Sequence, residues 1–201
     1  MPRRLRYQVA ASLDGFIAGD RGEYDWIVGD PAIDFKALYR EFDTAVMGRK
    51  TYDLMASQGG NVSMPGIDVI AFSRTLPPRH ERGVRVTDED PVTVVRELKA
   101  KSGRDIWLFG GGELFRTLLD AGLVDTVEIA VMPVLIGSGI PLLPPGARAR
   151  LVLADQKTLR DSGIVLLAYS VTGGITSPLR IRYVKVRRAK RKTAKSGRRR
   201  R

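Results

Sequence analysis

Three consecutive glycines, Gly110, Gly111 and Gly112, are the residues of this sequence whose types and spacing most clearly suggest chemistry. They follow an apolar run at residues 106–109 that predicts a buried strand, and residues 114–119 after them have the spacing of an amphipathic helix. A strand that enters a helix without side chains at the junction lets backbone N–H groups approach a phosphate closely, with the positive end of the helix dipole behind them. Three glycines also suit a plain tight turn or a helix-packing corner, so the junction alone leaves both interpretations open.

Two more predicted strand ends carry small, cationic or hydroxyl residues. They read Gly48-Arg49-Lys50-Thr51 and Ser73-Arg74-Thr75. In an open parallel sheet such strand ends lie along one edge, where ligands bind. A dinucleotide with a 2′-phosphate needs glycines for its pyrophosphate and arginines or hydroxyls for the extra phosphate. Taken singly, Arg49 and Arg74 are better interpreted as solvated surface cations, and only the three junctions together predict a nucleotide site.

Strand-like and helix-like segments alternate along the chain as far as residue 125, and strands dominate after it. Apolar runs predict strands at residues 5–13, 44–47, 69–72, 106–109, 127–135, 151–159 and 164–171. Helical spacing predicts helices at residues 34–42, 50–55, 92–100 and from the glycines to residue 121. Asp90 before Pro91 is a predicted N-terminal cap, and Gly122 is a predicted C-terminal cap. This order predicts an α/β fold, with a mostly parallel mixed sheet and an antiparallel pair of strands at the C-terminus.

The composition narrows the class of protein. A chain of 201 residues suits one domain of ordinary size. It has no cysteine and one histidine, His80, in a polar run, which argues against disulfides, thiolate metal sites and a catalytic zinc, so no metal is expected. No segment approaches about 18 apolar residues, and the apolar stretch near the N-terminus is too short and broken for a signal peptide. We therefore expect a soluble, cytoplasmic protein that does not contact a membrane.

The positive charge is concentrated toward the C-terminus. Of the 34 Lys and Arg residues, 13 lie within residues 179–201, which contain no acid, so residues 1–178 hold 21 basic and 22 acidic residues. The sequence predicts a folded domain over residues 1–178 and a cationic, disordered tail over residues 179–201. Such a tail binds nucleic acid weakly and without sequence preference through counterion release, or it is simply a solvated extension. Its near lack of aromatic residues argues against base stacking.

The three junctions together resemble the cofactor segments of the dihydrofolate reductase fold, and the resemblance covers about residues 4–172. Residues 46–52 (Val-Met-Gly-Arg-Lys-Thr-Tyr) are similar to its strand-to-helix cofactor segment. Residues 72–76 are similar to its adenosine 2′-phosphate segment, and residues 109–112 to its glycine turn. The order and spacing of the three segments match, which makes them specific jointly although each is weak alone.

This resemblance implies a three-layer α/β fold and NADPH as the cofactor. It implies that Arg49 and Arg74 contact the 2′-phosphate, and that Thr51 lies near the pyrophosphate. It also implies a cis peptide bond between Gly110 and Gly111. The cofactor-binding residues that it implies are Ala11, Ala18, Gly48, Arg49, Lys50, Thr51, Ser73, Arg74, Phe109, Gly110, Gly111, Gly112, Glu113 and Leu114.

Three further segments look like the reductase domain of the bifunctional riboflavin-pathway deaminase-reductase. They are residues 11–19, residues 122–125 and residues 132–142. That enzyme reduces a phosphoribosylaminopyrimidine and opens its ribose with a hydride from NADPH. The resemblance implies an NADPH-dependent reductase of a small heterocycle, or of a related compound with a C=N or C=O bond, and it implies a homodimer. In such sites the protein mainly positions the nicotinamide against an electrophilic carbon.

The sequence departs from the riboflavin enzymes at several positions. Gln8 stands where they usually carry a lysine, Phe109 where they usually carry an acid, and residues 52–55 replace an Asp-rich segment. The cysteines that a zinc deaminase partner needs are absent, so we do not expect that activity. The pattern is typical of stand-alone riboflavin-reductase-like proteins, whose substrate the sequence does not fix.

Two carboxylates are candidates for catalysis. Asp30 is the stronger one, and it is also a candidate for binding a pyrimidine- or pterin-like amidine, because a carboxylate accepts two parallel N–H bonds. Asp14 ends the first predicted strand beside Gly15, where a structural Asp-Gly turn is the favoured explanation. Trp26 is a candidate for stacking on a flat substrate, although core filling is the commoner fate of a tryptophan.

Alternative functions stay open at this point. A dihydrofolate or pterin reductase normally carries a buried carboxylate five residues after its tryptophan, but here that position is Pro31, with Asp30 beside it. A nucleotide-binding protein without turnover would keep the three junctions and lack a productive substrate pocket. A polyanion-binding protein would act through residues 179–201, and deleting them would abolish function while NADPH binding persists.

Overall fold

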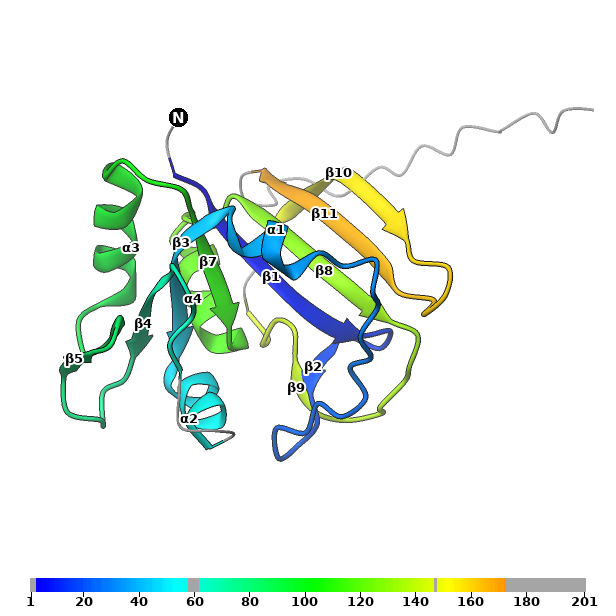
Figure 1. The fold of residues 1–201 in the computed structure, drawn as a ribbon, viewed down its shortest axis with the longest axis horizontal. Coiled ribbons are helices and arrows are strands. Elements are labelled where there is room, and N and C mark those ends of the chain that lie inside the picture. The colour runs from blue at the N-terminus through cyan, green and yellow to red at the C-terminus, as the bar shows by residue number, and fades with distance from the viewer. Residues whose placement is uncertain (1–2, 58–61, 147, 173–201) are drawn as a thin grey trace, which may run out of the picture.

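The computed structural model describes residues 3–57, 62–146 and 148–172, and Figure 1 shows their fold. The cationic segment at residues 179–201 and the domain boundary at residue 178 lie outside the described residues, so both stay predictions. None of the helices within the described ranges has the length and apolar character that a membrane crossing requires.

Strands and helices alternate through the first two thirds of the chain. The strands are β1 Leu5–Ser12, β2 Phe16–Ala18, β3 Phe42–Gly48, β4 Asp68–Phe72, β5 Arg79–Glu81, β6 Val84–Thr87, β7 Asp105–Gly110, β8 Thr126–Met132, β9 Ile140–Pro141, β10 Arg150–Thr158 and β11 Val165–Thr172. The helices are α1 Phe35–Tyr39, α2 Arg49–Ser57, α3 Pro91–Ala100 and α4 Gly112–Asp120.

Among the described residues, nine strands form one sheet in the order β10-β11-β8-β1-β7-β3-β4-β6-β5, and β2 pairs separately with β9. Strands β8, β1, β7, β3, β4 and β6 run parallel to one another. Strand β5 pairs antiparallel with β6. At the other end of the sheet, β10 pairs antiparallel with β11, and β11 pairs antiparallel with β8. The predicted α/β fold, with a mostly parallel mixed sheet and a C-terminal antiparallel pair, is confirmed.

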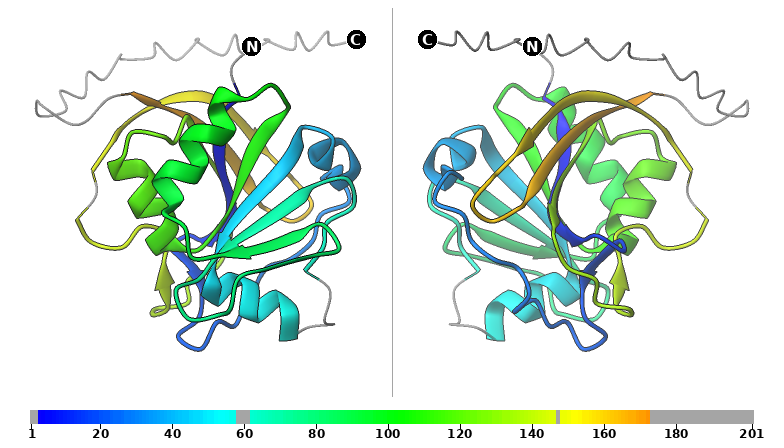
Figure 2. Two further views of the ribbon diagram at one scale, coloured as in Figure 1. Left: turned by 90° about the vertical axis from the view of Figure 1, so that its left-hand side faces the viewer. Right: turned by 90° about the vertical axis from the view of Figure 1, so that its right-hand side faces the viewer.

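Helices cover both faces of the large sheet, which makes the fold three-layered. Figure 2 shows α3 and α4 together on one face, and α1 and α2 on the other. Alternate residues of a strand enter opposite cores, as the period of a strand requires. In β7, Leu108 packs into the core under α3 and α4, while Trp107 packs into the core on the α1 and α2 face.

Two helix ends are capped as the sequence predicts. Helix α3 begins at Pro91, and the carboxylate of Asp90 accepts a hydrogen bond from the backbone N–H of Thr93 at 2.9 Å. Helix α4 ends at Asp120, and Gly122 after it has a φ of +68°, a conformation that glycine adopts without strain.

The sequence-based boundary at residue 42 is wrong. Phe42 begins β3 instead of ending α1, which already stops at Tyr39. Its ring is fully buried and stacks on Trp107 with the ring centroids 5.1 Å apart. Tertiary packing thus overrides the local helical spacing. The strands β2, β5, β6 and β9 were not predicted either, because each has only two to four residues, too few for a periodic pattern to stand out.

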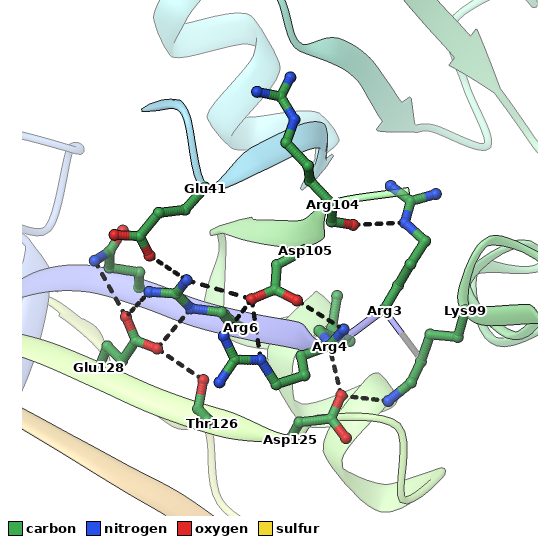
Figure 3. Close-up of polar contacts among 12 residues, drawn as sticks. Arg3, Arg4, Arg6, Glu41, Lys99, Arg104, Asp105, Asp125, Thr126 and Glu128 are labelled. Carbon is green, nitrogen blue, oxygen red and sulfur yellow. Dashed lines mark hydrogen bonds and ion pairs between the residues drawn. The ribbon is translucent and has the colours of Figure 1, made fainter. Parts of the chain in front are cut away.

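The central strand β1 carries a buried arginine that links its neighbours (Figure 3). The guanidinium of Arg6 donates two hydrogen bonds of 2.7 Å to the carboxylate of Glu128 in β8. It also pairs with Glu41, and its Nη1 lies 3.4 Å from Asp105 in β7. Burial lowers the pKa of Arg6, but the hydrogen bonds and charges of Glu128 and Glu41 outweigh burial and raise this pKa above its ordinary value. Arg6 therefore stays charged.

Replacing Arg6 with Met should lower the free energy of unfolding by about 3 kcal/mol, because it leaves the largely buried carboxylate of Glu128 without its cation. Arg4→Met is the matched control, since Arg4 also pairs with Asp105, at 2.6 Å, but its side chain is 56% exposed. An exposed pair of this kind contributes about 1 kcal/mol or less. Urea denaturation of both variants measures the difference, and equal losses would contradict the central role of Arg6.

Candidate active site

A large cleft of about 2420 Å³ opens where the parallel strands β3, β4 and β7 end, and it continues across β1 and β8 on the α1 face of the sheet. Of the cofactor-binding residues expected from the resemblance, all but Ala11 line this cleft. Ala11 is 2% exposed within β1, so its side chain belongs to the packed interior. The contact of the other residues with a cofactor stays a prediction.

The glycine junction lies at the N-terminal end of α4. The peptide bond between Gly110 and Gly111 is cis, as the resemblance implies. Gly111 is the N-cap of α4 and supplies no side-chain hydrogen bond, which leaves backbone N–H groups of the first turn open to a ligand. A Cβ atom at Gly110 would lie 3.4 Å from the hydroxyl of Thr51, and one at Gly111 would lie 3.6 Å from it. The glycines therefore keep a small polar gap open between α4 and Thr51.

A cluster of hydroxyls and cations gathers where β3 and β4 end side by side. Arg49 donates a 2.6 Å hydrogen bond to the hydroxyl of Thr75 and a 3.1 Å bond to Asp53. The hydroxyl of Thr75 lies 3.4 Å from that of Ser73. Arg74 is exposed and makes no hydrogen bond or ion pair with any described residue. Guanidinium and hydroxyl groups in this arrangement suit a phosphate.

Lys50, at the start of α2, is exposed like Arg74 and has no hydrogen bond or ion pair within the described ranges. Its ammonium group is therefore available to the cleft that it lines.

The remainder of the cleft has a floor made by the inner strands of the sheet. Trp107 and Phe109 of β7 line it with their ring centroids 5.0 Å apart, and the indole N–H of Trp107 donates to the backbone carbonyl of Gln8 at 3.2 Å. Gln8 and Glu128 also line this floor. Phe109 is among the residues expected at the cofactor site, but the sequence-based site missed Trp107, Gln8 and Glu128. Polar residues at every second position of a buried strand are a usable signal for the last two.

Asp30 does not line the cleft itself, although its neighbours Gly29 and Ala32 do. It is 6% exposed, and its carboxylate accepts hydrogen bonds from the hydroxyl of Ser162 at 2.5 Å and the N–H of Ala32 at 2.8 Å. These bonds, that from Ser162 first, hold the pKa of Asp30 below its ordinary value. Asp30 thus ties the loop before α1 to the turn between β10 and β11, which indicates a structural role. Its catalytic and substrate-binding roles stay predictions.

Asp14 and Trp26 also lie outside the lining of the cleft. The carboxylate of Asp14 accepts hydrogen bonds from the N–H groups of Gly137 at 2.8 Å and Ile136 at 3.1 Å. The hydroxyl of Ser12, followed by these backbone groups, lowers the pKa of Asp14. Trp26 packs against the apolar cluster that includes Met132, and its indole N–H donates to a backbone carbonyl. These contacts indicate structural roles for both residues.

Replacing Asp30 with Asn should lower the melting temperature at pH 7 and leave NADPH binding unchanged. Because the pKa of Asp30 is lower in the folded state, its carboxylate stabilises the fold above its unfolded pKa of about 3.9. That contribution is lost as the pH falls through the folded pKa, so the difference between the two proteins should begin to shrink below about pH 4. Thermal denaturation from pH 3 to 7 measures this. Asp68→Asn, at an exposed carboxylate of β4, is the control, and lost turnover at unchanged stability would return Asp30 to catalysis.

Comparison with known proteins places these features in a family. Residues 3–167 match the family model described as the RibD C-terminal domain. The chain is 32% identical over 183 residues to YyaP of Bacillus subtilis (strain 168), an uncharacterized protein, and the match covers 85% of this chain and 96% of YyaP.

Solved structures agree. A putative riboflavin biosynthesis protein from Shewanella sp. PV-4 is similar with a TM-score of 0.72 and 27% identity, over 86% of this chain and 100% of that one. Dihydrofolate reductase from Enterococcus faecalis, complexed with NADP(H), has a TM-score of 0.63 and 18% identity, over 85% of this chain and 97% of that one. The second likeness shows the dihydrofolate reductase-like fold alone.

Proposed function

The chain belongs to the family of the RibD C-terminal domain, and on this premise we propose that it is an NADPH-dependent reductase. It transfers a hydride to a small heterocyclic substrate, or to a related compound with a C=N or C=O bond. The observation that carries the proposal is that the three predicted phosphate-binding junctions line one cleft, which then continues over an aromatic and polar floor.

Two parts of the cleft fit the phosphates of this cofactor. The free backbone N–H groups and the dipole at the start of α4 suit the pyrophosphate, beside the hydroxyl of Thr51. The cluster of Arg49, Ser73 and Thr75, with Arg74 exposed beside it, suits the 2′-phosphate. The gap between the two parts is free of side chains at the glycine junction, where a Cβ atom would intrude.

The residues of the chain have positioning roles in this reaction. NADPH, when bound, supplies the hydride, and the hydride chemistry is its own. Phe109 directly precedes the glycine junction and packs on Trp107, so these rings border both the cofactor part and the floor. Apolar rings at this point exclude water from the reacting atoms and hold the two partners against one another.

Arg74→Ala should weaken NADPH binding about tenfold and leave NADH binding nearly unchanged, because NADH lacks the 2′-phosphate that a guanidinium binds. Calorimetry with each cofactor measures the two affinities. Arg96→Ala is the control, since Arg96 is an exposed arginine of α3 that does not line the cleft. Equal loss for both cofactors would remove Arg74 from the 2′-phosphate site.

We also propose that the protein forms a homodimer through the outer edge of β10. No described strand pairs with that edge, and three successive apolar side chains of β10 are exposed: Leu151 by 40%, Val152 by 53% and Leu153 by 47%. An unpaired strand edge with exposed apolar residues favours pairing with another chain. A second copy pairing the same edge antiparallel closes the assembly by two-fold symmetry. Separately, we propose weak, non-specific nucleic-acid contact by residues 179–201, on their charge alone.

Leu153→Lys should convert a dimer of about twice 22.2 kDa into a monomer of 22.2 kDa, because a charge at the paired edge is not matched by the partner. Light scattering after size exclusion measures the mass. Leu135→Lys is the matched control, since Leu135 is 69% exposed and lies outside β10. A wild-type protein that elutes as a monomer would refute the dimer.

A further inference from the structure

The floor of the cleft contains an unpaired hydrogen-bond acceptor. Within the described residues, the side-chain oxygen Oε1 of Gln8 is the buried polar side-chain atom that has no hydrogen-bond partner. Gln8 lines the cleft. Buried polar groups are nearly always paired, so an unpaired one at a binding surface indicates a place for a ligand donor.

The orientation of the Gln8 amide is fixed by its neighbour. Its Nε2 donates to the carboxylate of Glu128 at 3.2 Å. A carboxylate only accepts hydrogen bonds, so the amide nitrogen must face Glu128 and the oxygen must point elsewhere. Glu128 is itself held by the two bonds from Arg6 and by the hydroxyl of Thr126 at 2.8 Å, as Figure 3 shows. The network therefore presents Oε1 as an acceptor, and rotation of the amide would break it.

The surroundings of Gln8 leave room for a flat molecule. Gln8 is opposite Glu128 in the register of β1 and β8, and Glu128 is opposite Ala168 in β11. One step further along, Ala10 is opposite Ala130. Register partners point to the same face of a sheet, and all of these residues line the cleft. Ala10 and Ala130 also pack against the apolar cluster of Met132, Leu159 and Ile164, which borders the three alanines on one side. The alanines form a shallow, apolar shelf on which a ring can lie with one edge toward Oε1.

The charges around this shelf do not favour a phosphate. Arg6 is committed to carboxylates on three sides, with Glu128, Glu41 and Asp105 as its partners. Two charged residues of β10, Asp155 and Lys157, also line the cleft, and their opposite charges offset each other. Because Arg4 shares Asp105, the group of Arg4, Arg6, Glu41, Asp105 and Glu128 carries one net negative charge, which a phosphate dianion placed over the shelf would face.

We propose that the substrate is a planar, phosphate-free heterocycle whose ring lies on the alanine shelf and whose N–H group donates a hydrogen bond to Oε1 of Gln8. This substrate class rests on the reductase function proposed above. Gln8 is accordingly a substrate-binding residue, and Glu128 is a positioning residue that acts through Gln8.

The test uses the full-length protein saturated with NADP⁺ and two probes that differ by one phosphate. The probes are 5-amino-6-(ribosylamino)uracil and its 5′-phosphate, each titrated by calorimetry. We expect the phosphate-free probe to bind at least about tenfold more tightly, since the 5′-phosphate would face uncompensated carboxylates. Equal or tighter binding of the phosphate, or no binding of either probe, overturns the proposal. NADP⁺ binding in the same experiment separates this result from failure of the reductase function.

A variant pair tests the hydrogen bond itself. Gln8→Met keeps the length of the side chain but removes the acceptor, and it should weaken the phosphate-free probe about tenfold while NADP⁺ affinity stays unchanged. Glu97→Met, at an exposed position of α3 that does not line the cleft, is the control and should leave both affinities as they are. Unchanged probe binding in a folded Gln8→Met protein contradicts the role of Gln8.

Discussion

One buried positive charge constrains the centre of this protein. Arg6 sits on β1, between β7 and β8, and its guanidinium is neutralised by carboxylates from both neighbouring strands and from Glu41. Desolvation makes such an ion pair a weak source of net stability, but leaving any member unpaired is costly. A one-residue shift in the register of β1 and β8 would turn Arg6 and Glu128 to opposite faces of the sheet, so their ion pair disfavours that shift. The same Glu128 then fixes the amide of Gln8 on the floor of the cleft.

The cofactor part of the cleft is formed mainly by backbone groups, and the floor is formed by side chains. The cofactor part depends on backbone groups at the start of α4, on glycines that leave space, and on the ends of parallel strands that lie next to one another. The floor depends on side chains that point from the faces of β1, β7 and β8. Local chain geometry therefore determines the first part, whereas the pairing of distant strands determines the second.

This difference explains what the sequence could predict. The glycine junction, the Asp90 cap and the α/β class follow from neighbouring residues, and the sequence was sufficient for them. The placement of Asp30 depends on Ser162, which is 132 positions away, and no local pattern reports such a contact. Phe42 likewise joins a strand because Trp107 stacks on it across the sheet. Gln8, Trp107 and Glu128 were missed because they come from three strands, β1, β7 and β8, and meet only through sheet register.

The alanine shelf has a consequence for how this scaffold changes over evolutionary time. Ala10, Ala130 and Ala168 are small side chains on strands whose backbone is already held by sheet hydrogen bonds and by the Arg6 network. Larger or more polar residues at these positions alter the shape of the floor without moving the glycine junction. Natural selection can therefore change which substrate binds to the floor while the cofactor part of the cleft stays the same. Related chains with similar folds are then free to diverge in substrate.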